Sequence, residues 1–133
     1  MKNYKSKQIK KIKKHITATT VMLAILFLII GAGVGYGGFA LVCKNDKFEL
    51  KGETSIVLNV GDVATYTEEG FNAICFGKDV SKDVIIETNL TGTNGVYTID
   101  TSEPNEYYIK YTIKNFRFSE VVKYRVITIQ EVA

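Results

Sequence analysis

Histidine is almost absent from this chain of 133 residues, tryptophan is absent, and proline occurs once. The single histidine, His15, precedes a long uncharged segment, so no imidazole follows that segment to activate a serine or cysteine nucleophile. The chain has two cysteines, Cys43 and Cys75, which with no further histidine are too few to ligate zinc. We therefore expect no enzyme activity, no cofactor and no metal centre.

The first third of the chain has no acidic residue, and most of it has no basic residue either. Residues 1–15 contain seven lysines and no acidic residue, and residues 16–42 contain no Asp, Glu, Lys or Arg. Residues 43–133 hold ten basic and fourteen acidic residues, so that +7 and −4 give the net charge of +3. A soluble globular protein does not separate its charges in this way, and about 90 residues suffice for one small core.

The uncharged segment 16–42 has the length of a transmembrane helix. A helix of this length extends about 40 Å at 1.5 Å per residue, which exceeds the ~30 Å hydrocarbon core of a bilayer. The segment is also longer than the roughly 7–15 apolar residues of a cleaved signal peptide. We interpret it as an uncleaved signal anchor, while the small residues Gly38 and Ala40 leave cleavage after Ala40 open as an alternative.

The lysines indicate the orientation of this anchor. Basic residues are retained on the cytoplasmic side of a membrane, and residues 1–15 carry seven of them, whereas Lys44 and Lys47 are mixed with acidic residues. The sequence thus predicts a basic cytoplasmic tail (1–15), a transmembrane anchor (16–42), a short linker (43–47) and an extracytoplasmic domain (48–133). The lipid bilayer is the expected partner. No aromatic residues alternate with the lysines as in a nucleic-acid surface, so we expect no nucleic acid.

Glycines are concentrated in the second half of the predicted anchor. Gly31 and Gly35 lie four residues apart, as do Gly33 and Gly37, which places small residues in rows along the helix. Such rows let helices approach closely in a bilayer. They favour, as an alternative function, an accessory subunit that associates with another membrane protein through its transmembrane helix.

Beyond residue 47 the hydrophobic pattern has a period of two. In segment 106–114 the residues Tyr107, Ile109, Tyr111 and Ile113 fall on one face and are predicted to point to the core. Similar short segments are separated by Gly, Asn and Asp, and Asn94-Gly95 is a typical hairpin turn. About seven strands are expected, at 55–60, 63–67, 71–76, 84–90, 96–99, 106–114 and 119–130. Short connections favour antiparallel pairing, so we predict an all-β fold, a single sandwich of about seven antiparallel strands.

The order of several short motifs in this region resembles the bacterial surface immunoglobulin-like domains of Gram-positive envelope proteins and some insecticidal crystal proteins. The motifs are Leu50-Lys51-Gly52, Ile56-Val57-Leu58-Asn59-Val60-Gly61-Asp62, Tyr66-Thr67-Glu68-Glu69-Gly70-Phe71-Asn72-Ala73 and Arg125-Val126-Ile127-Thr128-Ile129. The resemblance covers about residues 47–130. Family members usually have Asp-Pro in place of Glu68-Glu69. The resemblance implies an Ig-like module that serves for binding, adhesion or spacing and has no catalytic role.

Acidic residues and cysteines of the domain offer little chemistry. The acids Asp62, Glu68, Glu69, Asp79 and Asp83 cluster around predicted turns, where we interpret them as solvated. Calcium is the alternative, because it binds carboxylate and carbonyl oxygens. We expect Cys75 to be a small core residue and expect no bond between it and Cys43, which lies at the membrane boundary.

Candidate binding residues lie between the last two strands, at Phe116, Arg117 and Phe118. Two exposed aromatic rings around an arginine have the composition of an interaction hot spot. In the alternative, Phe116 and Phe118 cap the open end of the sandwich. The partner expected for an exposed site is an extracytoplasmic protein or glycan, and for the glycine face a membrane protein.

Overall fold

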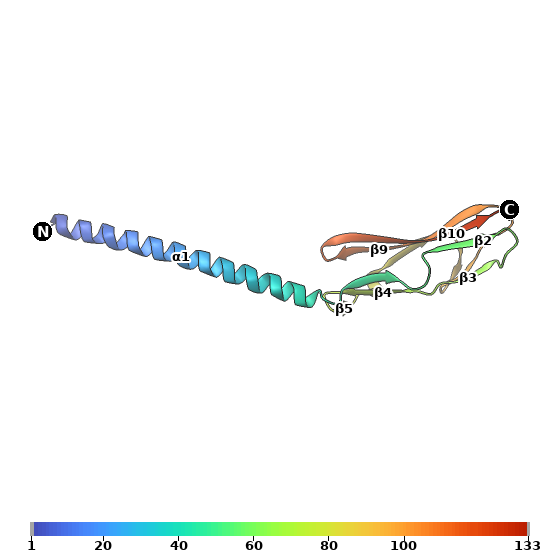
Figure 1. Ribbon diagram of the computed structural model, residues 1–133, viewed down its shortest axis with the longest axis horizontal. Helices are drawn as coiled ribbons and strands as arrows, with labels where there is room; N and C mark the ends of the chain where they lie inside the picture. The colour runs from blue at the N-terminus through green and yellow to red at the C-terminus, as the bar shows by residue number, and fades with distance from the viewer. Residues whose placement is uncertain (1, 133) are drawn as a thin grey trace. The chain divides into compact units, whose positions relative to one another are not determined.

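The protein is described by a computed structural model, which covers residues 2–132 and the side chains of residues 7, 9, 10 and 17–132. Met1 and most side chains of the predicted cytoplasmic tail lie outside the described residues. The chain divides into two compact units that meet between Val42 and Cys43 (Figure 1). The first unit is helical, and the second consists of β-strands.

The first unit is a single α-helix, α1 (Lys2–Val42), which continues through the basic tail into the apolar segment. Its stretch Thr17–Val42 has a mean hydropathy of 2.3, and none of it is buried within the structure. By length and composition this stretch is able to cross a membrane. Large apolar side chains such as Leu28 and Val34 are each 71% exposed, so the stretch presents an apolar surface that the rest of the chain does not cover.

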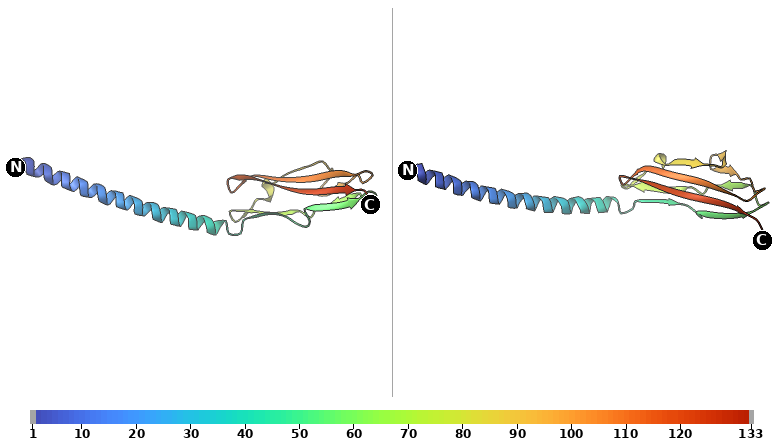
Figure 2. Two further views of the ribbon diagram at one scale, coloured as in Figure 1. Left: turned by 45° about the horizontal axis from the view of Figure 1, so that its top comes forward. Right: turned by 90° about the horizontal axis from the view of Figure 1, so that it is seen from above.

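Strands of the second unit form three small sheets, one of which has four members. In this sheet the order is β2-β10-β9-β6. The strands are β2 (Ser55–Asn59), β6 (Ile85–Thr88), β9 (Asn105–Phe116) and β10 (Ser119–Gln130). The long strands β9 and β10, orange and red in Figure 2, run the length of the domain.

Each of the other two sheets has three strands, in the orders β1-β4-β5 and β3-β8-β7. Their strands are β1 (Lys47–Leu50), β3 (Thr65–Thr67), β4 (Phe71–Cys75), β5 (Lys78–Asp79), β7 (Thr91–Thr93) and β8 (Val96–Thr98). A short 3₁₀-helix at Ser81–Asp83 follows β5. Only three residues separate β3 from β4 along the chain, so the chain passes directly from one of these sheets to the other.

All three sheets contribute to one hydrophobic core. The inward residues of β9, namely Ile109, Tyr111 and Ile113, are at most 2% exposed, which confirms the predicted face of this strand. They pack with Ile127 and Ile129 of β10. The remaining buried members are Phe48, Ala73, Leu90, Tyr97 and Ile99. Alternation of buried and exposed residues along β9 and β10 is therefore what holds the domain around a single core.

Several strands differ from the sequence-based expectation. The described residues form ten strands rather than about seven, because β1, β5 and β7 were expected as loop or linker. The pairing of β2 with β10 is parallel, whereas only antiparallel pairs were predicted. Two parallel strands require a long connection between them. The end of β2 at Asn59 and the start of β10 at Ser119 are far enough apart in the chain to allow it.

The turn predicted at Asn94-Gly95 is present. Both residues have positive φ, 53° and 77°, and they join β7 to β8. Thr91–Thr93, which was expected to belong to the same loop, pairs with β8 instead. A two-residue turn with positive φ at both positions matches the twist of the flanking strands, so the hairpin is tighter than the sequence indicated.

Candidate functional site

The candidate residues Phe116, Arg117 and Phe118 lie at the turn between β9 and β10. Arg117 and Phe118 both have positive φ, 50° and 67°, which is the backbone of a tight hairpin turn. Glycine and asparagine usually occupy such positions, and larger residues cost on the order of 1–3 kcal/mol each. This turn directs the three side chains into three different environments.

Phe116 packs against the core. Its ring centroid lies 6.3 Å from that of Phe48, and the residue is half-buried beside the core cluster. For this residue the packing matches the capping alternative. The pairing of β9 with β10 shifts register between Ile113 and Phe116, which interrupts the alternation of β9 and lets Phe116 turn toward the core.

Arg117 binds the segment that follows the helix. Its Nε donates to Oδ2 of Asp46 over 2.8 Å, and its Nη2 donates to the carbonyl oxygen of Cys43 over 2.9 Å. Its backbone N–H points to Sγ of Cys75, 3.4 Å away. The guanidinium also lies 5.9 Å from the ring of Phe116. Arg117 therefore fastens the start of the domain to the β9–β10 turn.

Asp46 connects three segments that are distant in sequence. Its side chain is fully buried, and its Oδ1 accepts a hydrogen bond of 3.2 Å from the backbone N–H of Gly77, in the β4–β5 turn. We call residues 43–47, 76–79 and 114–120, which meet here, the hairpin end of the domain. Figure 1 shows β5 and the β9–β10 turn at this end and the C-terminus at the other.

Ionisation of the hairpin end follows from these contacts. Burial alone would raise the pKa of Asp46, but the hydrogen bonds from Arg117 and from the backbone of Phe76 and Gly77 outweigh it and lower this pKa. Burial raises the pKa of the Cys43 thiol, and the hydrogen bond and charge of Asp46 raise it further. Both cysteines are buried and unbonded. Cys43 is thus a neutral thiol with little nucleophilic character.

Phe118 is the most exposed member of the group. It is 83% exposed, and its ring centroid lies 5.4 Å from that of Phe76. Phe76 is half-buried in the β4–β5 turn, and it too has positive φ, 51°. The hairpin end therefore presents two neighbouring aromatic rings, each on a turn whose backbone would favour a smaller residue.

A second polar cluster lies between the sheets and escaped the sequence analysis. The side chain of Arg125 is fully buried, and its Nη2 lies 2.8 Å from Oε1 of Glu68. Arg125 also donates to the carbonyl oxygens of Lys51, over 2.6 Å, and Glu53. The expectation that Glu68 is a solvated turn acid is wrong, because its side chain is 9% exposed.

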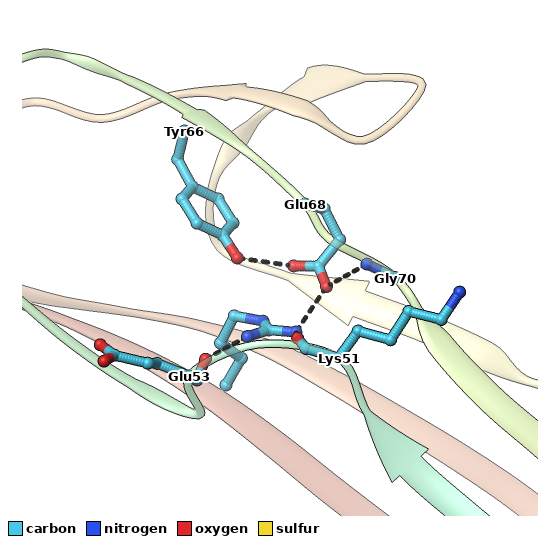
Figure 3. Close-up of polar contacts among 6 residues, drawn as sticks. Lys51, Glu53, Tyr66, Glu68 and Gly70 are labelled. Atoms are coloured by element: carbon cyan, nitrogen blue, oxygen red, sulfur yellow. Dashed lines mark hydrogen bonds and ion pairs between the residues drawn. The ribbon is translucent and has the colours of Figure 1, made fainter.

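Glu68 is bound on its other sides as well. The hydroxyl of Tyr66 and the backbone N–H of Gly70 both donate to its carboxylate over 3.1 Å (Figure 3). Burial and the charge of Glu68 raise the pKa of Tyr66, which keeps the phenol protonated. An arginine at the inward position of an alternating strand, two residues before Ile127, was the signal in the sequence that a buried acid must exist.

Other acids of the turns serve local hydrogen bonds. Asp62 accepts from the N–H of Asn59 over 2.6 Å, and Asp79 accepts from the N–H of Ser81 over 2.8 Å. Among the side chains that the structure describes, no three His, Cys, Asp or Glu residues come together in a way that could hold a metal ion. These acids therefore stabilise turns.

The predicted glycine rows lie on the surface of α1. A Cβ atom added to Gly31, Gly33, Gly35 or Gly37 would meet no atom within 4 Å among the described residues. With 3.6 residues per turn, the row of Gly31 and Gly35 lies about 160° around the helix from that of Gly33 and Gly37. The helix thus offers two separate small-residue faces.

Comparisons with known proteins give a likeness to a solved structure. No family model and no curated protein matches the chain. Among solved structures, a lipoprotein from Bacteroides thetaiotaomicron aligns with a TM-score of 0.46 and 22% identity, over 65% of this chain. The aligned part spans only 38% of that lipoprotein.

Proposed function

We propose that the protein is a single-pass envelope protein that displays one extracytoplasmic Ig-like module for binding, adhesion or spacing. The observation that carries this proposal is the direct junction of an apolar stretch, Thr17–Val42, to a compact β-domain that begins at Cys43. Arg117 and Asp46 hold the first residues of the domain against its own turns. A folded domain that begins directly after the apolar stretch suits a module that is displayed at a membrane.

The strand order supports the Ig-like part of the proposal. If β3 and β4 are taken as one interrupted strand, their two sheets join in the order β1, β4/β3, β8, β7. This corresponds to strands A, B, E and D of an immunoglobulin fold, and β6, β9 and β10 correspond to C, F and G. The parallel strand β2 then extends the second layer beside β10.

A tyrosine near the start of β9 supports the same assignment. The hydroxyl of Tyr107 donates to the carbonyl oxygen of Asp100, seven residues upstream, over 3.1 Å. Immunoglobulin-like domains carry such a tyrosine corner near the start of strand F, the counterpart of β9. The contact fixes the crossover between the two layers, where the chain leaves β8 and enters β9.

The buried polar groups support the absence of catalysis that belongs to this proposal. Arg125 and Glu68 are buried and bound to the backbone and to each other, and Asp46 is bound to Arg117. Groups that are paired in this way stabilise the fold and are unavailable for proton transfer at a cleft. The module therefore acts through its surface.

Topology provides the test. Ser102 is exposed in the loop before β9, and Ser102→Cys should react with a membrane-impermeant maleimide on intact cells. Ser6→Cys, in the basic tail, should react only after permeabilisation. Wild-type protein is the blank, because Cys43 and Cys75 are buried. Labelling of Ser6→Cys alone on intact cells would reverse the orientation and end the proposal.

A second function, accessory subunit of a membrane complex, is favoured by the open glycine faces of α1. Gly31→Leu with Gly35→Leu should lower association in a membrane two-hybrid assay if that face binds a partner helix. Gly33→Leu with Gly37→Leu is the matched control on the opposite face. An unchanged signal for both pairs would show that the glycines have no partner.

A further inference from the structure

The hairpin end of the domain includes the residue that directly follows the apolar stretch in the chain. Cys43 follows Val42 directly, and its carbonyl oxygen is 2.9 Å from Nη2 of Arg117. A helix of 26 residues is about 39 Å long, so in a bilayer of about 40–45 Å it ends within the headgroup region. Arg117 binds the first residue after this stretch, so Arg117 and its neighbour Phe118 are within reach of the lipid headgroups.

The side chains at this end suit that environment. Phe118 is 83% exposed and lies against Phe76 of the neighbouring turn, 5.4 Å away between ring centroids. Aromatic side chains at headgroup depth bury apolar surface in the interface. In water this pair leaves a large ring solvated, on a backbone with positive φ that a glycine would occupy with less strain.

The distribution of charge in the domain also favours contact between the hairpin end and a membrane. The hairpin end (residues 43–47, 76–79 and 114–120) holds five basic and three acidic residues, whereas the rest of the domain holds five basic and eleven acidic ones. Asp46 is neutralised by Arg117. The four lysines of this end, Lys44, Lys47, Lys78 and Lys114, are exposed. An anionic lipid surface attracts this end and repels the remainder of the domain.

We propose that the hairpin end docks on the outer leaflet of the membrane that holds α1, with Phe118 and Phe76 inserted among the headgroups. This inference rests on the proposed membrane anchorage. The contact sets the height and orientation of the domain, so that the loops at the opposite end point away from the membrane and toward an external partner.

Tryptophan fluorescence tests the proposal, because the chain has no tryptophan of its own. The full chain carrying Phe118→Trp is reconstituted in vesicles of phosphatidylglycerol and phosphatidylcholine, with and without brominated acyl chains. Val63→Trp is the matched control, since Val63 is 76% exposed. It lies at the other end, close to Val60, whose N–H donates to Gln130 at the end of β10.

Brominated lipid should quench Phe118→Trp at least twofold more than Val63→Trp, and aqueous iodide should quench the control at least twofold more. Equal quenching of the two tryptophans by lipid would overturn the docking. Flotation after an alkaline carbonate wash separates this outcome from a failure of the anchor. A chain that floats but shows equal quenching is anchored without docking, whereas a chain that is washed off contradicts the proposed function itself.

Discussion

Removal of Arg125 provides a strong test of how the domain is held together. Arg125→Met keeps most of the side-chain volume but removes the guanidinium that binds Glu68 and the carbonyl oxygens of Lys51 and Glu53. Glu68 then remains as a buried carboxylate without its cation. Breaking a buried pair in this way costs about 3–5 kcal/mol.

That cost is large relative to the whole domain. At about 0.05–0.15 kcal/mol per residue, a domain of about 90 residues has a free energy of unfolding of about 5–14 kcal/mol. With a shift of about 4–8 °C per kcal/mol, Arg125→Met should lower the melting temperature by about 12 °C or more. Glu68→Gln retains the shape and loses the charge, and it should cost about 1.5–3 kcal/mol.

Circular dichroism of the domain 43–133 during heating and in urea measures both effects, since tryptophan fluorescence is not available. Lys110→Met is the matched control, because Lys110 and Glu87 form an ion pair of similar length, 2.7 Å, whose side chains are 31% and 56% exposed. It should leave the melting temperature nearly unchanged. Equal losses for Arg125→Met and Lys110→Met would refute the argument that burial determines the strength of these pairs.

Two further predictions concern the hairpin end. The lowered pKa of Asp46 means that its contribution to stability is complete above the unfolded pKa of about 4 and is lost as the pH falls through the lower folded pKa. Asp46→Asn should therefore reduce stability at pH 7 and flatten its decline in acid, as urea titrations at several pH values would show; an unchanged slope would contradict the pairing with Arg117. Phe116→Ser should cost about 2 kcal/mol because the ring packs on the core, whereas Phe118→Ser should change stability by no more than about 0.5 kcal/mol. Calorimetry distinguishes them, and equal losses would mean that both rings cap the core.

Local sequence patterns predicted much of this fold because strand alternation and turn conformation depend on residues that are adjacent in the chain. Alternation along 106–114 requires one face to be buried, and Ile109, Tyr111 and Ile113 are indeed buried. Asn94-Gly95 formed the expected turn because both residues tolerate positive φ. Strands β1, β5 and β7 were missed because they are two to four residues long and lie in segments expected to be linker or turns.

The candidate site was predicted only in part, because the roles of its residues depend on distant segments. Nothing within 116–118 distinguishes the packed ring of Phe116 from the exposed ring of Phe118. The difference arises from the tertiary structure, in which Phe116 packs beside Phe48 whereas Phe118 is 83% exposed. Arg117 was recognised as a candidate, but its partners Asp46 and Cys43 lie 71 and 74 residues away in the chain.

By itself the sequence determined which part of the protein is apolar, where the charges are segregated and which positions of the long strands face inward. These properties depend on residues that are close in the chain and on the free energy of transferring side chains out of water. They can therefore be predicted without knowing which distant segments come into contact. Only the tertiary structure decided the parallel pairing of β2 with β10, the burial of Glu68 with Arg125 and the meeting of three turns around Asp46. Each of these joins residues that are remote in the chain, and their pairing is selected by the packing of the whole domain and not by any local preference.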